Sequence, residues 1–128
     1  MAIPAQSLSG SEVLRRGGVA ACSNTWTSIK FDGTFGAAAE QGHTVPANHI
    51  ITVTSMTFCE VGDADEGLSM YIVTNSQNIY IWRGSISKHD TFHWKDKFCL
   101  IGGDKLVVVA SSSANVDVLI NYIDQSWV

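Results

Sequence analysis

The stretch "IGGDKLVVVASSSANVDVLINYID" (Ile101–Asp124) decides the fold class. Two runs of β-branched and aliphatic residues flank a short loop of serine, alanine and asparagine. In the second run the apolar side chains occupy alternate positions, at Val116, Val118, Ile120 and Tyr122. Asp117 and Asn121 point the other way, which is typical of a strand with one face on a core and the other toward solvent. The stretch therefore predicts an antiparallel hairpin of two core strands.

The same pattern of short runs rich in strand-forming residues is found through most of the preceding chain. Further strand-like runs are "TWTSIKF" (25–31), "HIITVTSMTFCE" (49–60), "LSMYIVT" (68–74), "NIYIWRG" (78–84) and "TFHWKDKFCL" (91–100). Turn signals such as Asp32-Gly33 and Gly102-Gly103 separate them, and no segment of useful length has helical periodicity. About eight closely spaced strands without βαβ alternation predict an all-β antiparallel sandwich or barrel.

The first 23 residues differ from the rest, because they are small, polar and rich in glycine. "SGSEVLRR" has the composition of one helical turn, and Gly17-Gly18 would end it. Termini of this kind are usually mobile unless a partner binds them. The sequence thus predicts an extended N-terminal arm over residues 1–23 and a β-sandwich domain over residues 24–128.

Composition excludes several classes of protein. The chain has 128 residues, of which 45% are hydrophobic and 16% charged, against a usual charged share of about 25%. This balance is the reverse of that of disordered chains, and the length suits one domain. With a net charge of −4 and no basic run longer than Arg15-Arg16, nucleic acid is not an expected partner. No signal peptide or membrane-spanning stretch is found, so the expected site of synthesis is a cytoplasm, with no membrane partner.

Three cysteines, Cys22, Cys59 and Cys99, are odd in number and form no C-x-x-C pair. They are expected to be reduced and mostly buried, as small hydrophobic side chains made in a cytoplasm often are. A single bridge between Cys59 and Cys99, on neighbouring strands, stays open as an alternative.

No catalytic or metal-binding pattern is found. The four histidines (His43, His49, His89, His93) lack chelating spacing, because strand residues four apart lie about 13 Å from each other. No G-x-S-x-G elbow is present. The acidic loop at Asp63, Asp65 and Glu66 is interpreted as a solvated turn, with a weak loop-type Ca²⁺ site as the alternative. The sequence predicts neither enzymatic activity nor a cofactor nor a metal.

The tryptophans allow two interpretations, a packed core or a contact with a ligand or partner. Trp26 and Trp94 are expected in the core. All four, Trp26, Trp82, Trp94 and Trp127, could also form a sugar-stacking platform. Trp82, which shares parity with Tyr80, stays open between the two interpretations. Trp127 is expected to contact a partner subunit.

Two segments resemble small bacteriophage virion proteins. They are "TVPANHIITVTSMTFCEVG" (Thr44–Gly62) and "SISKHDTFHWKDKFCLIGGDKLVVVASSSANVDVLINYID" (Ser85–Asp124), which together span about the last two-thirds of the chain. The likeness lies in a "VPAG"-type strand entry and in a "GDKL.V.AS" hairpin followed by a closing strand. His89-Asp90-Thr91, His93 and Trp94 depart from the pattern. The resemblance implies a compact, jelly-roll-like β-sandwich on a virus particle, of the type of capsid decoration (cement) proteins.

From these observations we expect a phage capsid decoration protein that binds the outer shell and bridges neighbouring capsid subunits. Its expected partners are the major capsid protein and itself, as a homotrimer, at the capsid surface of the virion. The residues expected at subunit or capsid contacts are Leu8, Val13, Leu14, Arg15, Arg16, Trp82 and Trp127. The alternative is a receptor- or glycan-binding module of a tail or fibre, using Tyr80, Trp82 and the Asp63–Glu66 loop. A hydrolytic or metal-dependent enzyme on the same fold is the third hypothesis.

Overall fold

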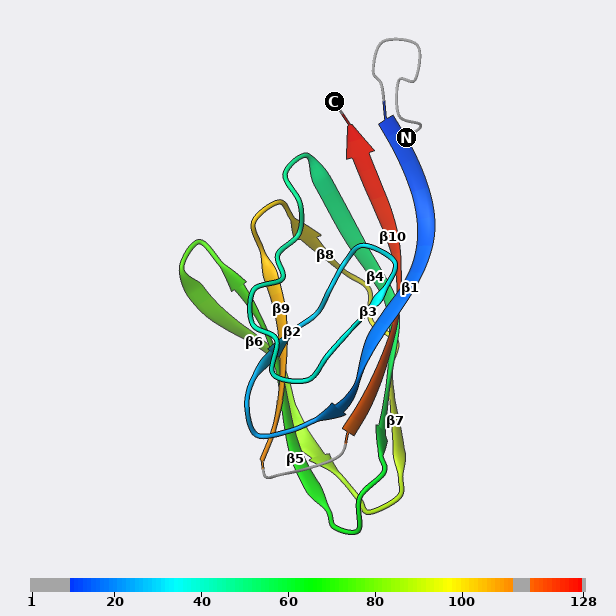
Figure 1. Cartoon of the computed structure of the whole chain (residues 1–128), viewed down its shortest axis with the longest axis vertical. Coiled ribbons are helices and arrows are strands. Elements are labelled where there is room, and N and C mark those ends of the chain that lie inside the picture. The colour runs from blue at the N-terminus through cyan, green and yellow to red at the C-terminus, as the bar shows by residue number, and fades with distance from the viewer. Residues whose placement is uncertain (1–9, 112–115, 128) are drawn as a thin grey trace.

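The computed structural model describes residues 10–111 and 116–127, and this part of the chain contains ten strands and no helix (Figure 1). The strands are β1 (Gly10–Cys22), β2 (Thr27–Ser28), β3 (Phe35–Gly36), β4 (His49–Glu60), β5 (Glu66–Thr74), β6 (Gln77–Ile86), β7 (Thr91–Trp94), β8 (Phe98–Ile101), β9 (Lys105–Ala110) and β10 (Val116–Trp127). No helix long and apolar enough to span a membrane occurs in these two ranges.

The strands form two sheets that pack face to face. Sheet A has the order β3-β1-β10-β4-β7, with β8 also paired to β4, and sheet B has the order β2-β9-β5-β6. Strands distant in sequence are neighbours in both sheets, so that β1 pairs with β10 while β2 pairs with β9. This wrapping of one antiparallel ribbon around another is the jelly-roll order. The predicted antiparallel, jelly-roll-like β-sandwich is therefore confirmed.

The core lies between the two sheets and follows the alternation seen in the sequence. Along β10, Val116, Val118, Ile120 and Tyr122 are almost completely buried and the residues between them are partly exposed. On β4, Met56 and Phe58 face the same interior, where they meet side chains of sheet B such as Met70. Each large apolar side chain buried in this way stabilises the fold by about 1.5–3 kcal/mol.

Residues 10–22 are not an arm, in contrast to the expectation for residues 1–23. They form β1, whose register with β10 runs from Gly10 opposite Trp127 to Val19 opposite Val118. Val19 and Cys22 are fully buried, so the end of this segment belongs to the core. Gly17 and Gly18 do not stop a helix but sit inside the strand, where neighbouring backbone comes close. Residues 1–9, including Leu8, lie outside the described residues.

A β-bulge on β4 explains why the predicted single strand at 91–100 is two strands. Ser55 pairs with Asn121 and Val53 with Tyr122, which leaves Thr54 as the extra residue. The edge of β4 is interrupted at this point, so β7 pairs on one side of the bulge and β8 on the other. Lys95, Asp96 and Lys97 connect the two short strands. This split, together with the two-residue strands β2 and β3, raises the strand number above the expected eight.

All three cysteines are free. Cys59 lies opposite Thr91, whereas Cys99 lies opposite Thr52, seven residues away along β4. At the rise of an extended strand this separation is about 23 Å, too far for a disulfide. The alternative of a Cys59–Cys99 bridge is therefore ruled out by the register.

Candidate interaction surface

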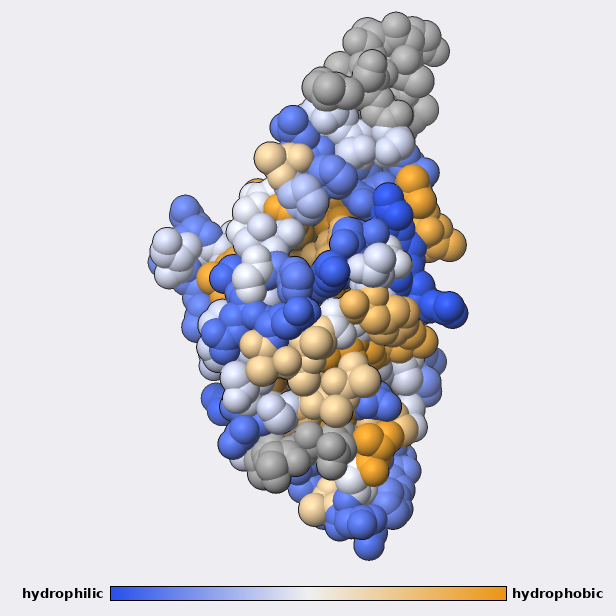
Figure 2. All heavy atoms as spheres, viewed as in Figure 1, coloured by the Kyte–Doolittle hydropathy of each residue, from blue (hydrophilic) through white to orange (hydrophobic). Residues whose placement is uncertain are grey.

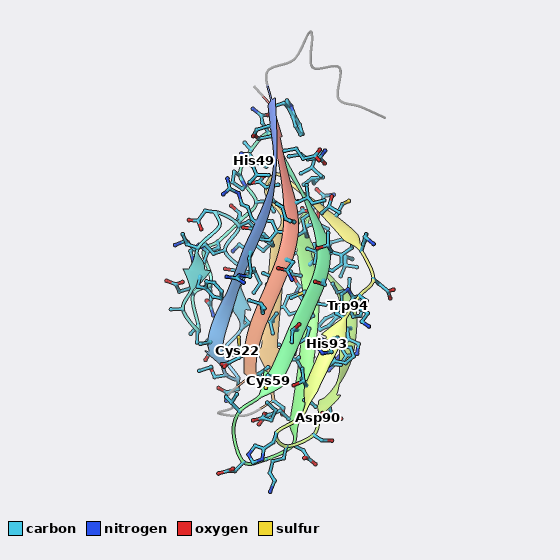
Figure 3. All side chains as sticks on the ribbon, turned by 90° about the vertical axis from the view of Figure 1, so that its right-hand side faces the viewer. Cys22, His49, Cys59, Asp90, His93 and Trp94 are labelled. Atoms are coloured by element: carbon cyan, nitrogen blue, oxygen red, sulfur yellow. The ribbon has the colours of Figure 1, made fainter. Side chains whose placement is uncertain are left out.

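The outer face of sheet A is the broadest regular surface of the described chain. Figure 3 views it directly, with β1, β10, β4 and β7 side by side and His93 and Cys59 labelled. By register and alternation it carries Glu12, Leu14, Arg16, Asp117, Leu119, Asn121, Ile123, Gln125, Trp127, Ile50, Thr52, Ser55, Thr57, Cys59, Thr91, His93, Cys99 and Ile101. We refer to these residues as the outer face of sheet A.

Charged side chains are few on this face and lie only on β1 and β10. They are Glu12, Arg16 and Asp117, three of the eighteen residues of the face. Asp117 accepts the backbone N–H of Ala21 at 2.8 Å. The half of the face formed by β4, β7 and β8 has no Asp, Glu, Lys or Arg. Solvated surfaces usually carry one such residue in every three or four, so this face is poor in charge.

Pairs of polar side chains on neighbouring strands satisfy one another across the face. The pairs are Thr57 with His93 (3.2 Å), Thr52 with Cys99 (3.6 Å), Asn121 with Ser55 (3.1 Å) and Gln125 with Glu12 (3.0 Å). Cross-strand pairs of this type hold side chains in one arrangement and contribute a few tenths of a kcal/mol each. Because these polar groups are already paired, covering them with a partner costs less than covering free ones.

A shallow apolar hollow of about 230 Å³ lies at the edge of this face. Its lining consists of Val19, Ala20, Phe35, Thr57, Cys59, Asp117, Val118 and Leu119. The Phe35 side chain is 55% exposed, and its ring lies against Gly18, at which an added Cβ would stand 3.0 Å from Phe35 Cε2. The hollow beside Phe35 and Leu119 is open to an apolar group from outside.

A buried carboxylate stabilises the opposite side of the same strands. Asp124 is 4% exposed; its Oδ2 accepts the Nε–H of Arg15 at 3.2 Å, and its Oδ1 lies 2.7 Å from Nδ1 of His49. The hydroxyl of Tyr122 accepts the N–H of Gly33 at 2.9 Å, and burial raises the pKa of this tyrosine. This network ties β1, β4 and β10 together on the inner side and keeps the sheet rigid beneath its outer face.

The predicted contact residues separate into two groups. Leu14 (75% exposed), Arg16 and Trp127 (41% exposed) lie on the outer face of sheet A by register. Val13 and Arg15 belong to the opposite face of β1, where Arg15 pairs with Asp124. Figure 2 shows hydrophobic side chains over the upper part of β1, beside hydrophilic ones. Leu8 falls outside the described residues.

Trp82 is not a surface platform. Its ring stacks on Phe92 with centroids 4.5 Å apart and also contacts Phe58, so it packs at the margin of the core. A bulge at Ile81 shifts the register between Met70 opposite Trp82 and Tyr71 opposite Tyr80. Tyr80 therefore lies with Tyr71 on the outer face of sheet B, so Tyr80 and Trp82, which the alternative glycan-binding module would use together, are on opposite faces.

The acidic loop is held by contacts within the chain. Asp65 accepts the backbone N–H of Lys88 at 2.8 Å, and Asp63 lies 3.1 Å from Nε2 of His89. Glu66 is buried and accepts the hydroxyl of Ser111 at 3.0 Å. Within residues 10–111 and 116–127, no group of three or more His, Cys, Asp or Glu side chains is arranged to hold a metal ion.

Several residues of the face and of the hollow at its edge were missed by sequence reasoning. Leu119 and Ile123 occupy the solvent-facing positions of β10, between Asp117 and Gln125. Apolar residues at positions that alternation assigns to water are the signal that could have found them. Phe35 carries no such signal, because it lies in a two-residue strand outside any alternating run.

Comparisons with known proteins find no matching family model and no matching curated protein. Among solved structures, the chain is similar to a Bacillus endospore appendage that forms disulfide-linked pili (TM-score 0.44, 8% identity, covering 93% of this chain and 88% of that one). It is also similar to a chain of the virus-like particle of the extra small virus of the giant freshwater prawn Macrobrachium rosenbergii (TM-score 0.43, 8% identity, covering 94% of this chain and 79% of that one). A third likeness is to the Eiger TNF of S. frugiperda (TM-score 0.38, 9% identity, 94% and 92% covered). At these TM-scores the likenesses carry no argument about function.

Proposed function

We propose that this chain is a phage capsid decoration protein that binds the outer shell through the outer face of sheet A and stabilises the shell by bridging neighbouring subunits. The observation that carries the proposal is that face, with three charged residues among eighteen and an apolar hollow at its edge. The resemblance of residues 44–62 and 85–124 to small phage virion proteins supports a shell as the partner.

The chemistry of the face favours an extended protein surface as its partner. A broad, charge-poor sheet with Leu14, Leu119, Ile123 and Ile101 exposed or half-exposed is covered at low desolvation cost by another protein surface. Nucleic acid would require a basic surface, and Arg16 is the one lysine or arginine on this face. A major capsid protein, repeated over the shell, provides a partner surface of the required kind and number.

Self-association is the second part of the proposal. Trp127 is half-exposed at the end of β10, beside Gly10. An exposed tryptophan at the end of a strand is typical of a subunit contact, and we propose that Trp127 packs between copies in a homotrimer on the capsid surface. Sedimentation of wild type and Trp127→Ala tests this part, because a trimer held by Trp127 dissociates in the variant. Equal masses for both proteins would contradict it.

Binding to the shell is tested with particles of the source virus from which this protein has been removed. We expect wild type to co-sediment with the particles and Leu14→Lys and Ile101→Lys to lose binding, because each places a charge on an exposed position of the face. Val61→Lys, the same kind of change at a 50% exposed position in the loop after β4, is the matched control and should bind as wild type. Binding by both face variants would contradict the proposal.

A receptor- or glycan-binding module of a tail or fibre is the second candidate. It is favoured by a groove of about 460 Å³ on sheet B, lined by Gly67, Leu68, Ser69, Arg83, Gly84, Val109, Ala110 and Ser111. Serine hydroxyls beside an arginine offer hydrogen bonds to a sugar. The copy number in purified particles separates the candidates: about one per capsid protein fits decoration, whereas a few per cent fits a tail or fibre. Glycan-array binding that Arg83→Ala abolishes would favour the second candidate.

A further inference from the structure

The free edges of the two sheets differ in length. Sheet A ends in β3, with two residues, and in β7 and β8, with four residues each; sheet B ends in β2, with two residues, and in β6, with ten. Between β7 and β8 the chain carries Lys95, Asp96 and Lys97, charges of the kind that protect an edge. β3 pairs only with Gly18 and Val19, so residues 10–17 of β1 also lack a neighbouring strand on this side, but they carry Glu12, Arg15 and Arg16. Within the described part of the chain, β6 is thus the long free edge whose outer part, residues 77–82, carries no charge. Figure 1 shows its hairpin with β5 projecting from the body.

The hairpin turn indicates which backbone groups of β6 face outward. Asn75 and Ser76 form a two-residue turn, with φ of 53° and 62°, between Thr74 and Gln77. Hydrogen-bonded and non-hydrogen-bonded residue pairs then alternate along the hairpin, and Thr74 with Gln77 is the first hydrogen-bonded pair. Ile79 consequently bonds to Ile72, while the N–H and C=O groups of Asn78 and Tyr80 point away from β5. Within the described residues these groups make no backbone hydrogen bond to another segment.

The side chains of this edge lack the usual protection against pairing. The segment "QNIYIW" (77–82) contains no charged residue, no proline and no glycine, and is rich in β-forming residues. Ile79 is 47% exposed and Tyr80 is 50% exposed. The bulge at Ile81 limits the regular edge to the hairpin end of the strand, where these two residues lie.

We propose that β6 pairs antiparallel with β6 of a second copy of this chain about a twofold axis. Asn78 then lies opposite Tyr80 of the second copy, and the two residues exchange N–H···O=C hydrogen bonds on both sides of the axis. Ile79 lies opposite Ile79 of the second copy, so each covers the other's exposed apolar surface. The pairing joins two four-stranded sheets into one continuous sheet.

Charge favours a second copy as the occupant of this edge. Each chain carries a net charge of −4, so close approach of two copies requires a neutral contact region. In the proposed register, residues 77–80 face only neutral side chains of the second copy. The two Arg83 side chains are kept apart, because each lies near the turn at Asn75 of the other copy. An isologous contact of this kind is self-complementary and closes after two copies. On a virus shell it would link neighbouring decoration subunits, but it does not depend on the outer face of sheet A.

Hydrogen–deuterium exchange of the full chain, measured over a range of concentrations, tests the pairing. We expect exchange in residues 77–82 to slow roughly fivefold when the total concentration exceeds the dissociation constant tenfold, with a matching rise in mass by sedimentation. Ile79→Lys places two positive charges opposite each other, and Asn78→Pro removes one outward N–H without touching the ladder to β5. Both variants should abolish the slowing.

Leu14→Lys is the matched control, since it adds the same charge to an exposed position on the other sheet and should keep the slowing. Thermal unfolding establishes that each variant is folded. Exchange in residues 77–82 that does not depend on concentration in wild type would overturn the proposal, as would slowing that persists in both β6 variants. Failure of the wild type to bind particles, with its edge pairing intact, would count against the proposed shell contact alone.

Discussion

The Phe35 ring lies against the backbone of Gly18, so close that a Cβ on this glycine would stand 3.0 Å from Phe35 Cε2 and 2.1 Å from the carbonyl oxygen of Val118. Gly18 also has a φ of +155°, a backbone conformation that residues with side chains rarely adopt. This contact joins the short strand β3 to β1 and forms one wall of the apolar hollow.

Gly18→Ala should therefore lower the free energy of unfolding by about 2–3 kcal/mol, from backbone strain together with overpacking. Chemical denaturation measures the change. Gly42→Ala is the matched control, because a Cβ at Gly42 meets no atom within 4 Å. If both variants unfold at the same denaturant concentration, Gly18 does not have the close contacts described here.

Asp124→Ala should destabilise the protein by about 2–3 kcal/mol, because it leaves Arg15 and His49 without their shared carboxylate. The cost is below that of a fully buried pair, since these two partners are 35% and 26% exposed at their side chains. Asp32→Ala removes a more exposed partner of Lys30 and should change stability by less than about 1 kcal/mol. Thermal unfolding compares the two variants, and equal effects would argue against a special role of Asp124.

Trp82→Ala should cost about 3 kcal/mol of stability, because it removes the ring stacked on Phe92 and leaves a cavity beside Phe58. Tyr80→Ala, two positions away, should cost less than about 1 kcal/mol, since Tyr80 is half-exposed and contacts Tyr71 and Arg83. Denaturant unfolding of both variants is the measurement. If Trp82 were a surface residue, Trp82→Ala would change the stability as little as Tyr80→Ala.

The three thiols should differ in reactivity. Burial, with a smaller contribution from the charge of Asp117, raises the pKa of Cys22 to about 12, whereas Cys99 is exposed. Iodoacetamide at about pH 8 should modify Cys99 in the folded protein and leave Cys22 intact, as mass spectrometry of peptides would show. Modification of Cys22 at the rate of Cys99 would contradict its burial.

The same shift predicts how stability depends on pH. The pKa of Cys22 is higher in the folded than in the unfolded state, so the folded state retains this proton to higher pH. Its contribution to stability is complete below the ordinary thiol pKa of 9.0 and is lost as pH rises toward about 12. Cys22→Ala should weaken this alkaline loss. Unfolding curves of wild type and variant between about pH 8 and 11 test it.

Alternation was sufficient to predict the last strand and its core side chains, because Val116, Val118 and Ile120 sit in a regular run. The predicted hairpin over residues 101–124 is wrong, because β9 and β10 lie in different sheets. Alternation was insufficient for β1, in which glycine at positions 17 and 18 is required by close backbone contacts rather than by a helix end. It also failed at Ile81, because one extra residue in the ladder places Tyr80 and Trp82 on different faces. Bulges arise from pairing between strands and leave no local mark in the sequence.

Gly10 and Trp127 are direct partners in the register of β1 and β10, so the two ends of the described chain lie together at one tip of the molecule (Figure 1). A short covalent linker between these positions, with new ends opened at the exposed turn Asn75-Ser76, would preserve every strand pairing. Such a circular permutant would present its ends at the tip of the β5–β6 hairpin, at the opposite side of sheet B from β2. Cargo fused to the original and to the permuted ends would therefore be displayed in two different directions from the same scaffold.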